Sequence, residues 1–525
     1  MVSCPSSLAS SAGLDILRAG GSAVDAAIAT SAVLSVVYPH MVGIGGDAFW
    51  LIHDGQTGKV RFLDGGGRAT ARATIANVRD LGLSEIPFRG IVPATLTVPG
   101  SVASWHEAHQ AYGKLPFART LASAIAYARD GFPITERVSD FIHTNRADLL
   151  PYADSCALFL PAGMAPRTGA MFKNVGLANT LSAIASDGAA GFYHGPVARA
   201  LVDFSQANGG FFALDDLAAQ AAFWGEPLVG SYRDVTLYQT PAPTQGFTVL
   251  QMLALLEPYQ LHNMEHLGAD AAHLMVQAKQ IAYHDRDRWL ADTRFANVPI
   301  DKLLSPSYLN QRRTLIDPAR SLSWDKVPSY GSLTGDTVYV GVVDAAGNAV
   351  SLIHSLYGLF GSGVVAGDTG VVLQNRSAYF SLDAAHPNHL QPGKTPMHTL
   401  IASVAFRNNK FWGVMGCMGA DGQPQIHLHT YVNMIDYGLD IQQALEAPRW
   451  LSGRFALGED RDTLHIESRF AQSTLAQLQR RGHKLNLWDS YAELAGHGHG
   501  IFVDPDSGMR IGGSDPRSDG AAIGY

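Results

Sequence analysis

Hydrophobic residues along the first half of the chain follow helical periods more often than strand periods. Helices are predicted over Pro5–Leu17, Ser22–Val36, Ser101–Gly131 with a break at Gly113, Thr248–Leu256 and Ala271–Tyr283. Phe49–Gly67 differs, because two apolar runs there flank the turn-forming residues 54–58. That pattern predicts a β-hairpin.

The second half begins with a change of character at residues 301–336. This segment is polar and rich in turn-forming residues, including Pro306, Pro318 and Pro328, and predicts an exposed connector with little regular structure. Two strands are then predicted over Thr337–Asp344 and Asn348–Tyr357. A third strand is predicted at Gly370–Gln374, helices at Ile426–Tyr437 and Ile441–Ala447, and strands at 465–470 and 483–488. Such a mixture favours stacked layers of sheet and helix.

Composition indicates a folded chain that binds neither nucleic acid nor membrane. Hydrophobic residues make up 46% and charged residues 16% of the 525 positions, which is ample for a deep core. The net charge is −8, and no long basic run is present. Cys4, Cys156 and Cys417 form neither a disulfide framework nor a zinc motif.

The N-terminal region lacks the basic segment and apolar core of a signal peptide. Its most apolar stretch, Ala23–Val37, is interrupted by Asp25 and is too short to span a bilayer, so it predicts a buried helix. We therefore expect a cytoplasmic protein.

The Asp336–Thr337 junction offers candidate chemistry. A threonine hydroxyl is a weak nucleophile that needs an adjacent base, and a threonine at a newly formed N-terminus carries one in its own α-amine. A polar connector followed by a rigid strand would leave room for chain cleavage and would fix the Thr337 hydroxyl in space. The alternative is a threonine that only begins a strand, and spacing alone favours it.

Two glycine-rich segments each permit two interpretations. Residues 416–424 precede a predicted helix, so their backbone N–H groups could form an oxyanion hole, or the segment could be an ordinary turn. Residues 43–48 fit the loose dinucleotide fingerprint, but a hairpin follows them where that fingerprint requires a helix. Close packing of a buried loop is the favoured interpretation of residues 43–48.

Histidines occur in two closely spaced pairs, His427 with His429 and His497 with His499. No carboxylate or cysteine cluster accompanies them, so structural or surface roles are favoured over metal binding. The sequence predicts no metal and no other cofactor.

Several long motifs, in order along nearly the whole chain, resemble the γ-glutamyltranspeptidase family of N-terminal-nucleophile hydrolases. They are SSLASSAGLDILRAGGSAVDAAIATSAVLSVVYPHMVGIGGDAF, VPGSVASWHEAHQAYGKLP, ARDGFPIT, GDTVYVGVVDAAGNAVS, FGSGVVAGDTGVVLQN, MGADGQPQ, YGLDIQQALEAPRW and GGSDPRSDGAAIGY. The resemblance favours the nucleophile interpretation of Thr337.

The resemblance implies a four-layer α/β/β/α sandwich, in which residues 1–336 and 337–525 are two fragments of one precursor and form one globular unit. Cleavage would separate Asp336 from Thr337, the nucleophile. The family's second hydroxyl falls on Ser355, and its oxyanion donors fall on the N–H groups of Gly419 and Ala420.

The same resemblance shows departures at positions that hold a glutamyl head. The arginine that binds the α-carboxylate is replaced by Ala94, and the aspartate that binds the α-ammonium falls near Tyr379. A serine pair falls on His398 and Thr399, and an asparagine falls on Tyr357. Without both charged partners, the site should not favour a zwitterionic head.

These departures point to the family's non-glutamyl branch, which includes an oxamate amidohydrolase of purine-nitrogen salvage and broader acylases. The predicted function is hydrolysis of a small carboxylated amide with release of ammonia. Arg376 is the favoured anion-binding residue, whereas Arg89 and Lys394 suit solvated surface positions equally well. A γ-glutamyltransferase, a side-chain acylase and a non-catalytic binding protein are the alternatives, and a homo-oligomer is left open.

Overall fold

Two stacked β-sheets form the centre of the molecule. The computed structural model describes residues 1–91, 93–322, 336–453, 461–504 and 506–525. The first sheet has the strand order β18 (Ala521–Ile523), β1 (Val2–Cys4), β9 (Asp336–Val343), β10 (Ala349–Tyr357), β2 (Asp47–His53), β3 (Val60–Gly65) and β6 (Phe223–Gly225). The second has the order β17 (Arg510–Ser514), β16 (Gly498–Val503), β12 (Lys410–Cys417), β11 (Ala402–Arg407), β8 (Val235–Gln239) and β7 (Leu228–Tyr232).

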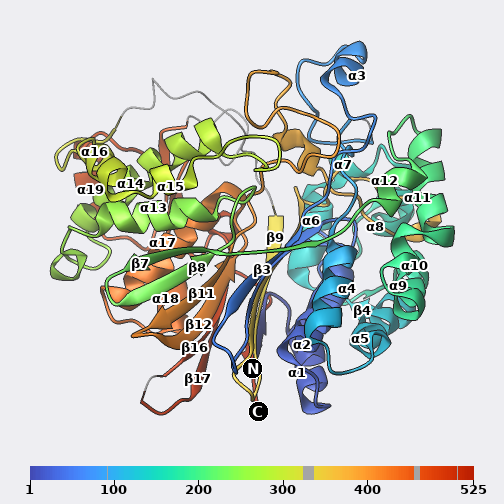
Figure 1. Ribbon diagram of the computed structural model, residues 1–525, viewed down its shortest axis with the longest axis horizontal. Coiled ribbons are helices and arrows are strands. Elements are labelled where there is room, and N and C mark those ends of the chain that lie inside the picture. Colours follow the sequence, from blue (N-terminus) through green and yellow to red (C-terminus); the bar gives the residue numbers. More distant parts are fainter. Residues whose placement is uncertain (92, 323–335, 454–460, 505) are drawn as a thin grey trace.

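Helices cover the outer face of each sheet (Figure 1). On the first sheet these include α1 (Ser7–Arg18), α2 (Ala23–Val37), α4 (Ser101–Tyr112), α5 (Phe117–Asp130) and α9 (Val175–Asp187). On the second they include α13 (Gly246–Leu256), α14 (Ala269–Trp289), α17 (Gln423–Ile435) and α18 (Ile441–Glu446). The architecture is thus the predicted four-layer α/β/β/α sandwich.

Alternation along the strands separates the cores on the two sides of each sheet. In β9, Val338 and Val340 pack toward α2, whereas Tyr339 and Val343 face the second sheet. This follows from the two-residue period of a strand, since successive side chains point to opposite faces. Each sheet is buried on both sides, which explains why β9 and β10 consist almost entirely of buried residues.

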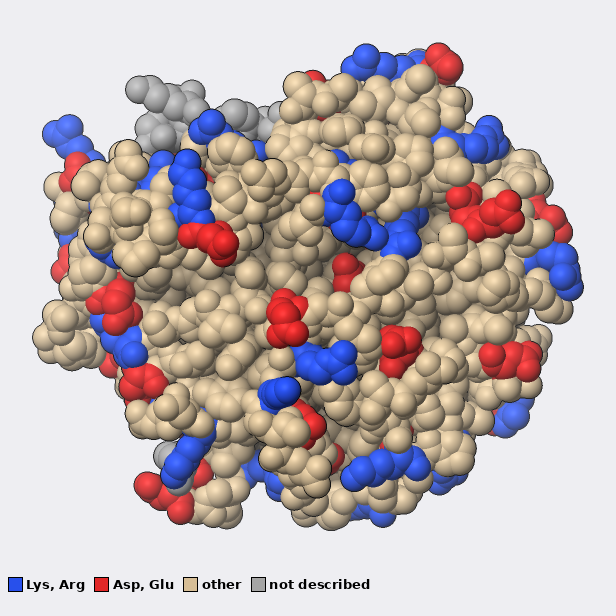
Figure 2. All heavy atoms as spheres, in the orientation of Figure 1, with Lys and Arg blue, Asp and Glu red and all other residues tan. Residues whose placement is uncertain are grey.

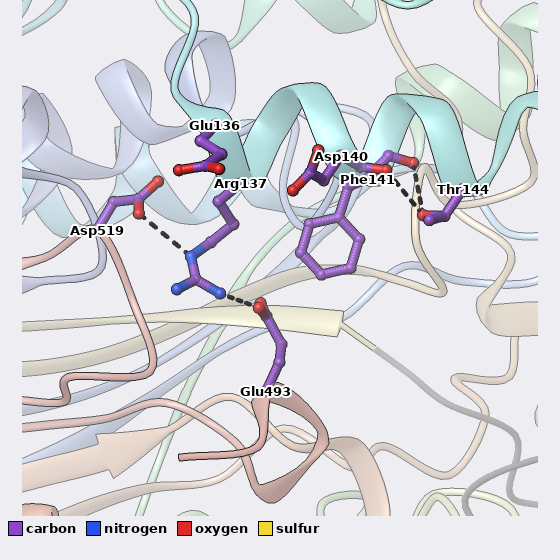
Figure 3. A pocket seen from close by; sticks show the side chains of 7 residues that line it. All are labelled: Glu136, Arg137, Asp140, Phe141, Thr144, Glu493 and Asp519. Carbon is purple, nitrogen blue, oxygen red and sulfur yellow. Dashed lines mark hydrogen bonds and ion pairs between the residues drawn. The ribbon is translucent and has the colours of Figure 1, made fainter. Parts of the chain in front are cut away.

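Residues before and after the Asp336–Thr337 junction share both sheets. In the first sheet, β9 and β10 lie between β1 and β2, and in the second, β7 and β8 extend a group of later strands. Arg137 of α6 (Glu136–Thr144) also pairs with Glu493 and Asp519 beside a surface cavity of about 400 Å³ (Figure 3). Both sides of the junction therefore contribute strands to each of the two sheets.

Most predicted elements are confirmed, but two are wrong. Residues 300–313 are largely helical, as α15 (Ile300–Leu303) and α16 (Pro306–Arg313), where we predicted a connector with little regular structure. Pro306 lies in the first turn of α16, where no donor is needed, and the Ser305 hydroxyl caps that helix. The later connector residues 323–335 lie outside the described part of the chain.

The structure describes residues 370–374, but no strand forms at Gly370–Gln374 where we predicted one. Only an isolated bridge joins Val365 to Val372, because the chain turns at Gly367 and Gly370, both with positive φ. The loop packs against the glycine-rich segment 43–48, and a Cβ on Gly45 would lie 2.0 Å from the Val372 carbonyl oxygen. Close packing therefore explains that segment, which leads into β2 as predicted.

The surface mixes both signs of charge, as Figure 2 shows for one face. Among the described residues, no helix has the length and apolarity that crossing a bilayer would require.

Candidate active site

Three polar side chains lie in a row where the first sheet faces the second. Thr337 shares its face of β9 with Tyr339, Ser355 shares its face of β10 with Ile353, and Asp47 opposes Ser355 across the β10–β2 ladder. All three are almost fully buried. Strand alternation therefore places Thr337, Ser355 and Asp47 at the polar end of a largely apolar interface between the sheets.

The Thr337 hydroxyl has two side-chain partners. Its Oγ donates to Ser355 Oγ at 3.2 Å and accepts from Gln423 Nε2 at 3.3 Å. Ser355 Oγ also accepts the backbone N–H of Tyr357 at 2.7 Å, where a bulge interrupts the β9–β10 ladder and Tyr357 has φ 82°. Gln423 is held in turn by the Ile401 N–H, which donates to its Oε1 at 3.0 Å. The hydroxyl is thus held by a strand of the first sheet, β10, and by the first residue of helix α17.

Gly419 and Ala420 form the turn between β12 and α17. Their φ angles are 144° and 45°, and the Gly422 N–H donates to the Gly419 carbonyl at 2.6 Å. Because N–H and C=O point in opposite directions across a trans peptide, this bond turns the Ala420 N–H away from the helix. Neither the Gly419 nor the Ala420 N–H donates a hydrogen bond to a described residue. Both N–H groups are therefore available to a developing oxyanion.

Two residues from earlier in the chain support this turn. Gln245 Nε2 donates to the carbonyls of Ala420 at 3.1 Å and Thr399 at 2.9 Å. Arg286 Nη1 donates to Gln245 Oε1 at 2.7 Å and to Asp421 Oδ1 at 2.6 Å. Both side chains are buried, so the position of the turn depends on residues preceding Thr337.

Arg376 is fully buried and only partly paired. Its Nη1 donates to Thr399 Oγ at 3.0 Å, but Nε and Nη2 have no hydrogen-bond partner among the described residues. The guanidinium lies 4.4 Å from the Tyr357 ring centre and 5.7 Å from that of Tyr379. Burial lowers the pKa of Arg376, because it disfavours the charged form. Free donors on a buried cation are what an anionic ligand would use.

His398 lies beside Asp47, with Nε2 3.4 Å from Asp47 Oδ2. Both side chains are fully buried, and burial is the main cause that lowers the pKa of His398 and raises that of Asp47 to about 7. Contacts thus link Thr337 to Ser355 and Ser355 to Tyr357, link Arg376 to Tyr357, Tyr379 and Thr399, and join Thr399 to Ala420 through Gln245.

The structure corrects the surface interpretation of Lys394 and of the histidine pairs, and it shows the partners of Arg89. Lys394 is buried and donates from Nζ to the Pro387 carbonyl, so its surface interpretation is wrong. Arg89 is partly exposed and pairs with Asp148 and the carbonyls of Leu359 and Gly361, so its donors are engaged there. His427, His429, His497 and His499 are all buried, which excludes a surface role for them.

Sequence reasoning missed Asp47, Gln245, Arg286 and Gln423. Asp47 stands in the glycine-rich segment 43–48. Since Asp47 lies two residues before Phe49 on the same strand, its side chain points to the same face of the sheet as the apolar Phe49. Gln423 directly follows the turn that we singled out. For Gln245 and Arg286 the local pattern gives no signal, since each reaches the site only through tertiary contacts.

Comparisons with known proteins show the family of this chain. The Gamma-glutamyltranspeptidase family profile matches residues 9–525. The Glutathione hydrolase-like YwrD proenzyme of Bacillus subtilis is 41% identical over 100% of this chain and 98% of its own length. The Oxamate amidohydrolase proenzyme of Klebsiella pneumoniae is 40% identical over 100% and 98%. The crystal structure of cephalosporin acylase from Bacillus halodurans matches with TM-score 0.92 and 35% identity, over 100% of this chain and 96% of that one. The chain belongs to the γ-glutamyltranspeptidase family and is a hydrolase of the amidohydrolase and acylase type.

Proposed function

We propose that Thr337 is the nucleophile of a self-cleaving amidase that acts on small carboxylated amides such as oxamate. The observation that carries this proposal is the buried Thr337 hydroxyl, held between Ser355 and Gln423 and followed by a rigid strand. The relatives named as proenzymes support cleavage of this chain as well.

In maturation, Thr337 Oγ would attack the carbonyl carbon of Asp336. The bond from that carbon to the Thr337 nitrogen breaks, and an ester to Oγ replaces the amide. Water then hydrolyses the ester, which leaves a carboxylate on Asp336 and a free α-amine on Thr337. The products are residues 1–336 and 337–525.

In turnover, the α-amine of Thr337 takes the proton from its own Oγ as Oγ attacks the substrate amide carbon. The N–H groups of Gly419 and Ala420 stabilise the negative oxygen that forms. The amine then protonates the leaving nitrogen, ammonia departs, and water hydrolyses the acyl ester. Ser355 Oγ, within hydrogen-bonding distance of Thr337 Oγ, orients the nucleophile.

Arg376 supports a substrate that carries a carboxylate. It offers two donor nitrogens without described partners, and Thr399 fixes its orientation. Tyr357, Tyr379 and His398 fill space around it, which favours a short substrate. Oxamate, named for a relative 40% identical to this chain, has one carboxylate next to a primary amide.

Cleavage is tested by separating the purified protein on a denaturing gel and sequencing the N-terminus of the smaller fragment. We expect two fragments, the smaller beginning Thr-Val-Tyr-Val, and a single uncut chain for Thr337→Ala. A wild-type protein that stays uncut yet active would overturn the proposal.

Substrate class is tested by comparing kcat/KM for oxamate and a γ-glutamyl anilide in one preparation. Two charge-assisted hydrogen bonds to a glutamyl head, each worth roughly 1.5–3 kcal/mol, are missing at Ala94 and Tyr379. The value of kcat/KM for the anilide should therefore be about 10²–10⁴-fold lower than in a site that makes both bonds. A faster reaction with the anilide would favour the γ-glutamyltransferase alternative. Rapid turnover of a bulky acyl amide alone would favour the acylase alternative.

A further inference from the structure

Several buried polar atoms of the candidate site have no hydrogen-bond partner among the described residues. They are Asp47 Oδ2, both ring nitrogens of His398, and Nε and Nη2 of Arg376. The three residues come from β2, from the segment before β11 and from the short helix η4 (Arg376–Tyr379), and each is fully buried. Buried polar atoms are almost always hydrogen-bonded, so a group of unpaired ones indicates a place for a small polar ligand.

Asp47 is held so that one carboxylate oxygen remains for that ligand. Its Oδ1 accepts from the Gly100 N–H at 3.1 Å and from Gln374 Nε2 at 3.0 Å. A Cβ on Gly67 would lie 2.8 Å from the same oxygen, so the backbone crowds this side. Oδ2 lies on the other side, 3.4 Å from His398 Nε2. Its strand neighbour is Ser355, which accepts from Thr337.

We propose that Asp47 is a specificity-determining residue of the substrate pocket: protonated, it leaves Arg376 free for a monoanionic amide, and ionised, it opposes that anion. The proposal rests on the proposed function for its substrate site and adds a residue that neither the sequence motifs nor the comparisons assign.

Electrostatics near Asp47 supports this role. Burial raises the pKa of Asp47 to about 7, while the Arg376 charge acts in the opposite direction. An anion bound at Arg376 would cancel part of that charge, so binding of the anion and protonation of Asp47 favour each other. Ionised Asp47 would instead interact with the positive charge of Arg376 in place of the anion.

The effects of other ionisable groups on the pH dependence must be distinguished from the effect of Asp47. His398 has a lowered pKa and stays neutral. Tyr193 has a raised pKa, and its hydroxyl donates to the Pro99 carbonyl. Arg376 remains a cation near neutral pH. The α-amine that cleavage would create on Thr337 is expected to titrate near pH 7–8. Burial also raises the pKa of Asp64 in β3 to about 6 and lowers that of Lys279 in α14 to about 7, and the Asp47→Asn variant keeps all three of these groups.

The test compares oxamate with oxamide, its neutral analogue of nearly the same shape, from pH 6 to 8.5. Both substrates use the same α-amine as base, so the ratio of their kcat/KM values cancels its catalytic role. We expect the oxamate-to-oxamide ratio to fall about tenfold in the wild type as Asp47 ionises, as one pK unit of coupling would give. In Asp47→Asn, which keeps the shape of the side chain, the ratio should change less than about threefold.

The outcomes separate the two proposals. A ratio that falls equally in Asp47→Asn would assign the effect to the α-amine and overturn the role of Asp47. A ratio independent of pH in the wild type would also overturn it, and both results would leave the amidase proposal intact. If the cleaved protein neither hydrolyses oxamate nor is inhibited by it at pH 6, the proposed substrate class fails, and the role of Asp47 fails with it.

Discussion

Two buried clusters of charged residues in this protein differ in how completely they are paired. We call Arg449, Glu467, Asp515 and Arg517 the paired cluster, and Asp47, Arg376 and His398 the site cluster. Arg517 bridges Glu467 at 2.7 Å and Asp515 at 3.0 Å, and Arg449 also pairs with Asp515. In the site cluster, by contrast, Arg376 keeps two nitrogens without described partners, and Asp47 only approaches His398.

This difference in pairing is what we expect if the paired cluster is structural and the site cluster binds a ligand, as proposed. Desolvating an ion costs several kcal/mol, and only close partners with good hydrogen bonds offset that cost. The paired cluster meets this condition, since the pKa of Asp515 is held well below its usual range by Arg449 and Arg517. The site cluster does not meet it, so the fold sustains an unfavourable arrangement that a bound anion would relieve.

The largest effect that we predict concerns histidines, three of which feel the charges of the paired cluster. Burial lowers the pKa of His427, His429, His497 and His499 to about 3 each. A group with a lowered folded-state pKa stabilises the fold above its unfolded pKa of about 6.5 and loses that contribution as pH falls toward 3. Each histidine should then cost up to about 1.4 kcal/mol per pH unit below 6.5.

Together the four histidines should make Tm fall steeply between pH 6.5 and 4.5, as thermal unfolding followed by circular dichroism would measure. His40, His354, His398 and His483 also have pKa values that burial lowers, so they add to the same slope. His427→Leu gives a matched control, since it should reduce the slope by roughly one eighth. A flat Tm over this range would mean that the histidines are protonated in the folded state.

The second prediction compares the two clusters directly. Arg517→Met leaves the buried Glu467 and Asp515 with fewer partners and should lower the free energy of unfolding by roughly 3–5 kcal/mol. Arg376→Met removes a poorly paired cation and should leave the stability unchanged or raise it. It should nevertheless lower kcat/KM for oxamate by at least about tenfold, since a charge-assisted hydrogen bond is worth about 1.5–3 kcal/mol.

Chemical denaturation of the two variants in parallel measures both stabilities, and oxamide provides the neutral substrate. Equal destabilisation by Arg376→Met and Arg517→Met would show that Arg376 is a structural residue. An equal loss of activity on oxamate and oxamide would argue against anion binding.

Local pattern predicted the elements of this fold but not their order in the sheets. The β9–β10 pair and the β2–β3 hairpin are joined by short turns, and their sequences specify both partners. The pairing of β1 with β9 and β18 links residues hundreds of positions apart, which no local period encodes. At Pro306 the residue that we took for a turn signal begins a helix, because proline suits both positions.

The site residues also divide into those that the local sequence indicates and those that it does not. Thr337, Ser355 and the turn at Gly419 and Ala420 stand in motifs whose family resemblance indicates their roles. Asp47 could have been found from strand alternation once β2 was predicted. Gln245 and Arg286 could not, because they act through hydrogen bonds between helices and a distant turn.

The third prediction concerns that support of the turn. Arg286→Lys keeps the charge but not the planar fork, in which Nη1 donates to Gln245 and Asp421 while Nε and Nη2 hold Asp287. A turn that shifts by a fraction of an ångström should stabilise the oxyanion less, so kcat should fall about tenfold while KM changes little. Gln245→Glu is the second variant to test, since it loses the donor to Ala420 at a similar size. A rise in KM alone would place Arg286 in substrate binding instead.

The smallest effect should come from removal of metal ions. On α17, His427 and His429 are two positions apart, so their side chains point to different sides of the helix, and His429 Nε2 lies 2.9 Å from the Trp450 carbonyl. His497 Nε2 lies 3.1 Å from Glu493 Oε1, and within the described ranges no group of three metal-binding side chains comes together. Since the proposed chemistry uses the Thr337 hydroxyl, its α-amine and backbone N–H groups without a metal, dialysis against a chelator should leave kcat on oxamate unchanged. Activity that disappears in chelator and returns with zinc would show that a pair of these histidines, with a further ligand, binds a metal that the reaction requires.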